Sequence, residues 1–193
     1  GNAVNDWADA IQSIALFVDT IRIATGLVTS NQVVFTGSPL LYISDDSFAN
    51  VSVRLSLQPS LNNTGGNLDL DDFGFSLSSS NLLLEPGSSQ KSPSLTAIAS
   101  ANDSNRIDII ATKLKFVQMP STTGKNNIMN PAVTVEAVDA NNNRDRDFNA
   151  AIKITSTGLM KQNEYVSTAL NGLASFSTIK HMEIGNGLFL KAV

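Results

Sequence analysis

The chain contains no cysteine and a single histidine, His181. The first absence excludes disulfide bonds and thiolate metal sites. With one imidazole and no thiol, a catalytic zinc site has almost no ligand set. No G-x-S-x-G motif is present either, so a serine-hydrolase triad has no support. The simplest interpretation of His181, within the segment IKHMEIGNG, is an exposed turn residue.

Charged and aromatic residues are also scarce. Charged residues make up 16% of the chain, well below the usual quarter. The net charge is -4, the pI is about 4.8, and no run of lysine or arginine occurs, so we expect no binding to nucleic acids. No segment reaches the ~18 consecutive apolar residues of a membrane-spanning helix. We therefore expect no membrane insertion.

Serine, threonine and asparagine take the polar role, and apolar residues recur at alternate positions. The clearest example is Pro131–Phe148, PAVTVEAVDANNNRDRDF, in which Val133, Val135 and Ala137 point one way. A period of two predicts a half-buried strand, which β-branched residues favour. The polar run DANNNRDRD predicts a corner of turn-forming residues, none of which we expect to enter a core.

Short strands and polar turns alternate along most of the chain, which predicts an all-β protein with antiparallel sheets. Residues 7–18 are the one place where a helix competes, because their apolar residues also fall at helical spacings. We favour a hairpin of residues 13–18 and 20–24. Asn171-Gly172 is the strongest hairpin signal, and it predicts a turn between two late strands.

The most regular strand of the first half is expected at residues 48–57. Its residues Val51, Val53, Leu55 and Leu57 should face inward, as in a sheet with one wet face. The other predicted strands are at residues 32–36, 40–44, 68–77, 81–84, 95–100, 106–110, 112–117, 151–155, 164–169, 173–176 and 188–192. A boundary near residue 110 divides them into two sandwich domains, residues 1–110 and 111–193, with almost no linker.

The second of these domains resembles the immunoglobulin-like (Big/invasin-type) repeats of bacterial surface and secreted proteins. The resemblance covers about residues 111–193 and rests on three motifs: an L-x-F-x-x-Q-P first strand, a V-x-A-x-D-x-x-G-N strand and corner, and an N-G-x-A-x-F hairpin. The matching residues are Leu114, Phe116, Gln118, Pro120, Val135, Ala137, Asp139, Asn143, Asn171, Gly172, Ala174 and Phe176. Asn142 stands where the family usually has glycine. The resemblance implies two tandem immunoglobulin-like antiparallel β-sandwiches, since the first half is loosely similar to adjoining modules.

One candidate metal site follows the strand predicted around Val133, Val135 and Ala137. Oxygen donors at every second position could hold calcium, a hard cation that takes six to eight oxygen ligands; they are Asp139, Asn141, Asn143 and Asp145, with Asp147 beyond them. The spacing imitates the start of an EF-hand loop, but Arg144 takes the glycine position and Ala150 the glutamate position. The alternative is a corner in which these side chains cap backbone groups.

One acidic and one aromatic group of residues could also form a functional site, but a structural role explains each of them more simply. Asp69, Asp71 and Asp72, with Asp45 and Asp46, could supply paired carboxylates for glycoside hydrolysis, but exposed strand ends explain them more simply. Trp7, Tyr42 and Tyr165 could form a sugar-stacking platform, but they are scattered over the chain. Packing in a core or interface is the simpler interpretation of these aromatic residues.

These observations favour a non-catalytic structural or adhesion module of a larger bacterial surface or secreted protein, located outside the cell. Its partners would be neighbouring domains of the same polypeptide and a surface protein or polysaccharide. No cofactor is expected beyond the candidate calcium. The alternative is a carbohydrate- or calcium-binding accessory module of an extracellular hydrolase. An enzyme would require carboxylates converging in a pocket.

Overall fold

The computed structural model describes residues 6–44, 46–63, 66–77, 79–88 and 106–193. Almost all of its regular structure is antiparallel strand, so the all-β prediction is confirmed. The chain forms two compact units, residues 1–107 and 108–193. The sequence had indicated a boundary at residue 110.

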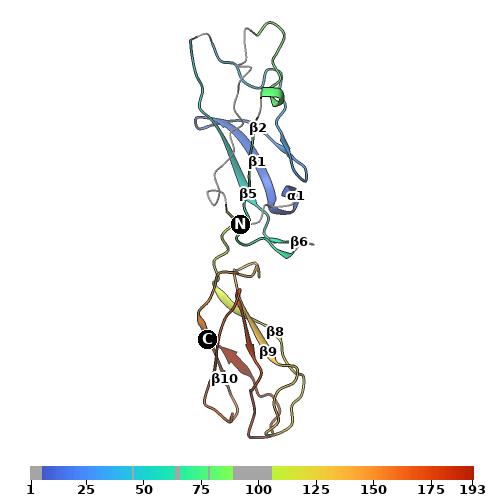
Figure 1. Ribbon diagram of the computed structural model, residues 1–193, viewed down its shortest axis with the longest axis vertical. Helices are drawn as coiled ribbons and strands as arrows, with labels where there is room; N and C mark the ends of the chain where they lie inside the picture. The colour runs from blue at the N-terminus through green and yellow to red at the C-terminus, as the bar shows by residue number, and fades with distance from the viewer. Residues whose placement is uncertain (1–5, 45, 64–65, 78, 89–105) are drawn as a thin grey trace. The chain divides into compact units, whose positions relative to one another are not determined.

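The first unit is built on a three-stranded sheet in the order β2-β1-β5 (Figure 1). Its elements are α1 Trp7–Ala10, β1 Ile11–Val18, β2 Ile21–Thr25, β3 Leu27–Val28, β4 Val33–Val34, β5 Val51–Leu57, β6 Asn62–Asn63, β7 Gly66–Asn67 and the 3-10 turn η1 Ser79–Asn81. The predicted hairpin is confirmed, because β1 pairs antiparallel with β2. The helix is a single turn, capped by the Asp6 side chain, which accepts the Ala8 amide at 3.0 Å.

Three predicted strands of this unit are wrong. Residues 40–44, 68–77 and 81–84 form no ladder among the described residues, and a strand is stable only with a hydrogen-bonded partner. Phe73 and Phe75 instead join Trp7 in an aromatic cluster, with ring centroids 4.8 Å apart for Trp7 and Phe75. The predicted strand 95–100 lies outside the described residues, and 106–110 contributes only a bridge from Arg106 to Asp72.

The sheet of the first unit is covered unevenly within the described residues. Ile14 of β1 is buried, whereas Val51 and Val53 of β5 remain 48% and 47% exposed. The prediction that all four alternate apolar residues of β5 face a core is therefore wrong for these two. Leu55 and Leu57 are partly buried, as expected.

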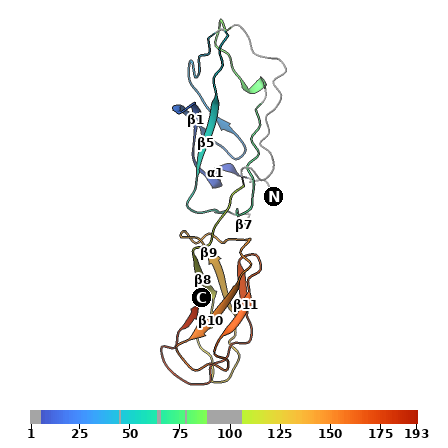
Figure 2. The same cartoon turned by 90° about the vertical axis from the view of Figure 1, so that its left-hand side faces the viewer.

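The second unit consists of two three-stranded sheets, in the orders β8-β9-β12 and β13-β10-β11. Strands of both sheets are visible in Figure 2. The strands are β8 Lys113–Gln118, β9 Val133–Val138, β10 Ala151–Ser156, β11 Tyr165–Thr168, β12 Leu173–Phe176 and β13 Leu190–Ala192. Each of them falls within a residue or two of a predicted strand, because their alternation is regular.

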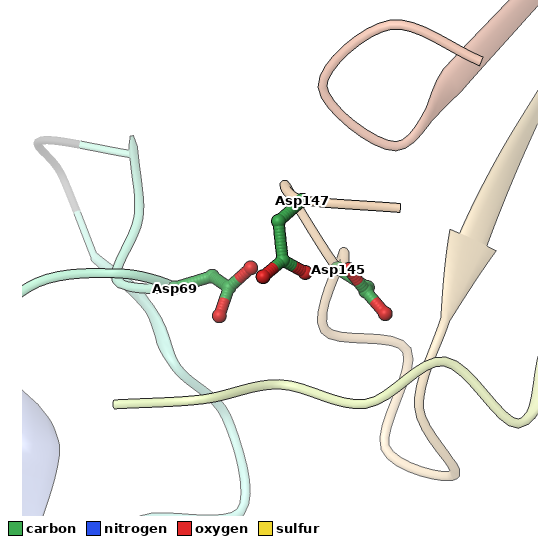
Figure 3. A group of neighbouring side chains, drawn as sticks. All are labelled: Asp69, Asp145 and Asp147. Carbon is green, nitrogen blue, oxygen red and sulfur yellow. The ribbon is translucent and has the colours of Figure 1, made fainter. Parts of the chain in front are cut away.

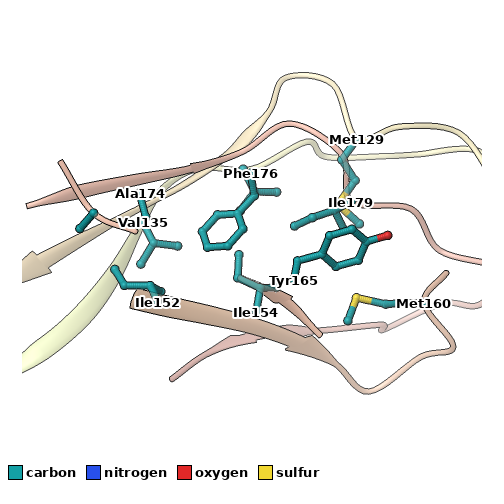
Figure 4. Packing of buried hydrophobic residues seen from close by; sticks show 11 residues of the cluster. Met129, Val135, Ile152, Ile154, Met160, Tyr165, Ala174, Phe176 and Ile179 are labelled. Carbon is teal, nitrogen blue, oxygen red and sulfur yellow. The ribbon is translucent and has the colours of Figure 1, made fainter. Parts of the chain in front are cut away.

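One hydrophobic core joins the inner faces of these two sheets (Figure 4). β9 contributes Val133 and Val135, and β10 contributes Ile152 and Ile154, all with at most 1% exposure. The remaining buried members are Met129, Met160, Tyr165, Ala169, Ala174, Phe176 and Ile179. Two sheets that bury their facing sides against each other form a β-sandwich.

The Asn171-Gly172 turn is confirmed, but the hairpin ladder predicted around it is not. Asn171 and Gly172 have φ of 51° and 72°, as two-residue hairpin turns require, and Leu170 and Leu173 exchange backbone hydrogen bonds across it. Beyond that single bridge the flanking strands separate. β11 pairs with β10, whereas β12 pairs with β9 in the other sheet.

Candidate functional site

The candidate site is the corner loop, residues 139–148, which follows β9. Asp139 organises its first half, since its Oδ1 accepts the backbone amides of Asn141 and Asn143, each at 2.8 Å. Its Oδ2 accepts the side-chain amide of Asn143 at 2.9 Å. These contacts are the local caps that aspartate commonly supplies at turns. Asn143 is buried, although the sequence had led us to expect no corner residue in a core.

Asp145 holds the second half of the corner loop and is also buried, at 6% exposure. Its Oδ1 accepts the backbone amide of Phe148 and its Oδ2 that of Ala111, both at 2.8 Å. Ala111 precedes β8, an edge strand that pairs with β9. The Asp145 carboxylate therefore links the corner loop to the segment that leads into β8. Figure 3 shows the side chains of Asp145 and Asp147 on the corner loop, where Asp147 is exposed.

Backbone conformation also shapes the corner loop. Asn142 has φ of 68°, the left-handed region that glycine and asparagine adopt most readily. It therefore fills the conformational role of the glycine that the resembling family has there. Gly172 packs against the loop so closely that a Cβ would lie 2.0 Å from the carbonyl oxygen of Asp145.

Two positively charged side chains in or beside the corner loop pair with acceptors of the same unit. The Arg144 guanidinium lies 3.2 Å from a carboxylate oxygen of Glu136 on β9. The Lys113 ammonium donates to the carbonyl oxygen of Ala140 at 2.9 Å. A cation bound in the loop would therefore be repelled by two positive side chains, Arg144 within the loop and Lys113 bonded to it.

The predicted calcium ligands are brought together only in part. Asp139 and Asp145 accept amides of the corner loop and its neighbours, and Asn143 donates its backbone and side-chain amides to Asp139. The side chain of Asn141 is exposed, and its backbone amide is the group that Asp139 caps. Coordination would have to displace or share hydrogen bonds that already satisfy both carboxylates. The capping role thus accounts for the pattern, and calcium binding stays a prediction.

The other acidic cluster lies in the first unit and does not match the simple expectation of exposed strand ends. Asp69 is fully buried, and its backbone amide donates to the Asn67 side chain at 2.7 Å. Asp71 and Asp72 are partly buried, Asp46 is exposed, and Asp45 lies outside the described residues. Asp69 lies in the turn that follows β7, next to the buried Leu68.

The aromatic residues considered as a sugar platform serve packing instead. Trp7 contacts Phe73 and Phe75 edge-on. Tyr165 is buried in the core of the second unit, where its hydroxyl accepts the Lys180 amide at 3.2 Å. Tyr42 is 81% exposed. Packing, the simpler interpretation, therefore holds for Trp7 and Tyr165.

His181 is not the exposed turn residue that the sequence suggests. It forms an isolated antiparallel bridge with Met160, and its carbonyl oxygen accepts the Asn126 amide at 2.7 Å. The ring is partly buried, and its Nε2 is buried without a hydrogen-bond partner among the described residues. The bridge explains the burial, since it draws residues 181 and 160 together at the rim of the sandwich.

A shallow depression in the first unit is lined by Ala8, Asp9, Gln58, Pro59 and Ser60. Asp9 is the only ionisable side chain in that lining, so the depression does not hold the pair of carboxylates that glycoside hydrolysis requires. Among the residues that the structure describes, no helix is long and apolar enough to cross a membrane.

No protein-family model matches the chain, and no curated protein or solved structure is significantly similar to it.

Sequence reasoning missed two features of the corner loop. The bond from Asp145 to Ala111 joins residues 34 positions apart, and no local pattern marks such a contact. The contact of Gly172 with Asp145 was signalled indirectly, because the Asn-Gly pair predicted a turn. Nothing in the pair indicated which backbone that turn would touch.

Proposed function

We propose that the chain is a non-catalytic structural or adhesion module, a spacer or interaction pair within a larger bacterial surface or secreted protein. The observation that carries the proposal is the use of the corner-loop carboxylates. Asp139 and Asp145 cap backbone amides of the sandwich, so the most polar loop of the second unit stabilises the fold. Chemistry on a substrate would require such groups to be directed outward into a pocket.

The order of strands supports the immunoglobulin-like part of this proposal. One sheet contains the first, second and fifth strands of the unit, β8, β9 and β12, and the third strand, β10, lies in the other. Immunoglobulin domains divide their first, second, third and fifth strands in the same way, but the fourth strand of the constant type joins the first sheet, whereas β11 pairs with β10 in the second. Of the residues that carry the resemblance, Val135, Ala137, Ala174 and Phe176 are buried.

Low charge and a surface rich in serine, threonine and asparagine support a location outside the cell, where neighbouring domains of the same polypeptide would be the first partners. The functional contacts would then lie on loops at the ends of the sandwich, which vary without loss of the core. Fold alone does not fix a partner, and a surface protein or a polysaccharide each fits this role.

The proposal is tested by looking for a ligand response in the whole chain. Thermal unfolding is followed by circular dichroism in millimolar calcium and in EDTA, and retention is measured on a panel of insoluble polysaccharides. A spacer predicts the same melting temperature in both solutions and no retention. A calcium-dependent rise that is lost in Asp139→Asn, or specific retention, would show a binding module rather than a spacer.

Single-molecule stretching supplies the positive test of a spacer. A spacer must keep its length under load, so the second unit should extend in one cooperative step. Its 86 residues, 108–193, would release about 300 Å of chain at roughly 3.5 Å per residue. Gradual extension at low force, without a discrete step of that size, would contradict a mechanical role.

A further inference from the structure

We propose that Asn186 is a site of spontaneous deamidation in the folded protein, and that the fold protects the chemically identical pair at Asn171. The chain contains two Asn-Gly pairs, Asn171-Gly172 and Asn186-Gly187. Both pairs are followed by leucine and can undergo the same ring closure, so we expect the structure around each pair to set most of the difference in their reactivity in the native protein.

The reaction uses the backbone of the following residue as its nucleophile. The amide nitrogen of glycine attacks Cγ of the asparagine side chain, a new C–N bond closes a five-membered succinimide, and the side-chain nitrogen departs as ammonia. The amide proton passes through solvent to the leaving group. Water then opens either carbonyl of the ring, which yields aspartate or isoaspartate. Glycine favours ring closure because it has no Cβ and rotates freely, so the nitrogen can reach the attacking geometry.

Contacts in the folded protein prevent that backbone rotation at Gly172. Its amide donates to the carbonyl oxygen of Phe148 at 3.2 Å, and it is buried. Its Cα lies so near the Asp145 carbonyl that a Cβ would be 2.0 Å from the oxygen. The bonds between Leu170 and Leu173 fix the turn from both sides. Reaction at Asn171 therefore requires local opening of the corner.

The second pair lies in an open position. Asn186 and Gly187 are both exposed, and a Cβ built at Gly187 would meet no atom within 4 Å. No hydrogen bond among the described residues holds the Gly187 amide. The neighbouring Ile184 side chain is 87% exposed. Nothing in the described structure opposes the rotation that brings the amide nitrogen of Gly187 to Cγ of Asn186.

The same loop should tolerate the product. It is anchored on one side by Met182, whose amide donates to the Leu159 carbonyl at 2.8 Å, and on the other by Phe189, which exchanges bonds with Thr157. Residues 184–187 form the tip between these anchors. The extra backbone carbon of an isoaspartate would therefore enter the tip without breaking a described hydrogen bond. The added negative charge would stand three residues from Glu183.

The test is incubation of the folded chain at mildly alkaline pH, with peptide mapping by mass spectrometry to locate the conversion and separate aspartate from isoaspartate. We expect Asn186 to convert at least about tenfold faster than Asn171, because only Asn171 must wait for local opening. Equal rates in the native protein, or faster conversion at Asn171, would overturn the proposal.

Two controls separate the fold from intrinsic chemistry. In concentrated denaturant both sites should convert at similar rates, and a persistently slow Asn171 would show that the fold is not what protects it. In the native protein, Gly187→Ala should slow conversion at Asn186, since a side chain hinders ring closure. An unchanged rate in that variant would exclude the cyclic route.

Discussion

The two units of this chain differ in how completely their sheets are covered. In the second unit, two three-stranded sheets bury their inner faces against each other, and Val133, Val135 and Ile154 have no exposed surface. In the first, a single three-stranded sheet is covered at one end, and Val51 and Val53 of β5 stay half exposed among the described residues. A regular alternation of apolar residues thus predicts a strand in both units, but it becomes a core only where a second sheet faces it.

The polar residues of the two units also differ in burial, and those of the second unit are the more buried. In the corner loop of the second unit, Asp139 and Asp145 cap backbone amides, and Asp139 also accepts the side-chain amide of the buried Asn143. In the first unit, exposed hydroxyl contacts such as that between Ser13 and Ser56, at 2.7 Å, lie on an open face of the sheet. We therefore expect substitutions in the second unit to have the larger effects on stability.

The largest effect is expected from Gly172→Ala. The new Cβ would collide with the Asp145 carbonyl at a positive φ, and we expect a loss of more than about 3 kcal/mol in the unfolding free energy of the second unit. Gly187→Ala is the matched control, because Gly187 also has positive φ but open space around it; it should cost about 1 kcal/mol. Denaturant unfolding by circular dichroism measures both. Equal costs would show that the collision is relieved.

The next effect tests the difference between the cores. Ile154→Ala removes buried methylenes between the two sheets and should destabilise the second unit by about 3 to 4 kcal/mol. Val53→Ala, at a half-exposed position on the same face of β5 as Leu55, should cost less than about 1 kcal/mol. Trp7, the only tryptophan, reports on the first unit by fluorescence. A large effect of Val53→Ala on that signal would mean that this face is covered in solution.

A smaller effect is expected from the corner-loop carboxylate. Asp145→Ala leaves the partly buried amides of Ala111 and Phe148 without their acceptor, which should cost about 2 to 3 kcal/mol. Asp108→Ala removes an exposed carboxylate of the same unit and serves as the control. The two variants should differ by at least about 1 kcal/mol in unfolding free energy. If they have the same stability, the capping bonds contribute nothing measurable.

The smallest effect on stability is expected at Asn142, whose backbone is in the left-handed region. Asn142→Gly should change stability by less than about 0.5 kcal/mol, because glycine reaches the φ of 68° without strain. Asn142→Val should cost about 1 to 2 kcal/mol, since a β-branched residue is disfavoured there. Thermal unfolding of the two variants side by side measures this difference. Equal stability would show that the loop relaxes away from the left-handed conformation.

How far the fold could be predicted depends on whether the signal is local. The strands of the second unit follow from alternation within each segment, as Val133, Val135 and Ala137 show. The predicted strands at 40–44 and 68–77 failed because alternation does not supply a partner, and Phe73 and Phe75 packed on Trp7 instead.

The candidate site was predicted correctly as a corner but not as a buried one. Its residues are polar, and polarity normally indicates exposure. Asn143 and Asp145 can be buried because each has a hydrogen-bond partner, the Asp139 carboxylate for Asn143 and the Ala111 amide for Asp145. For Asp145 one partner is distant in sequence, so no local pattern could reveal it.

The central claim is that the corner-loop carboxylates serve the fold rather than a bound cation. Amide hydrogen exchange at Ala111 and Phe148, measured with EDTA present, tests it most directly. Both amides should be strongly protected without calcium and unchanged when calcium is added. Fast exchange in EDTA that becomes slow on addition of calcium would contradict the account.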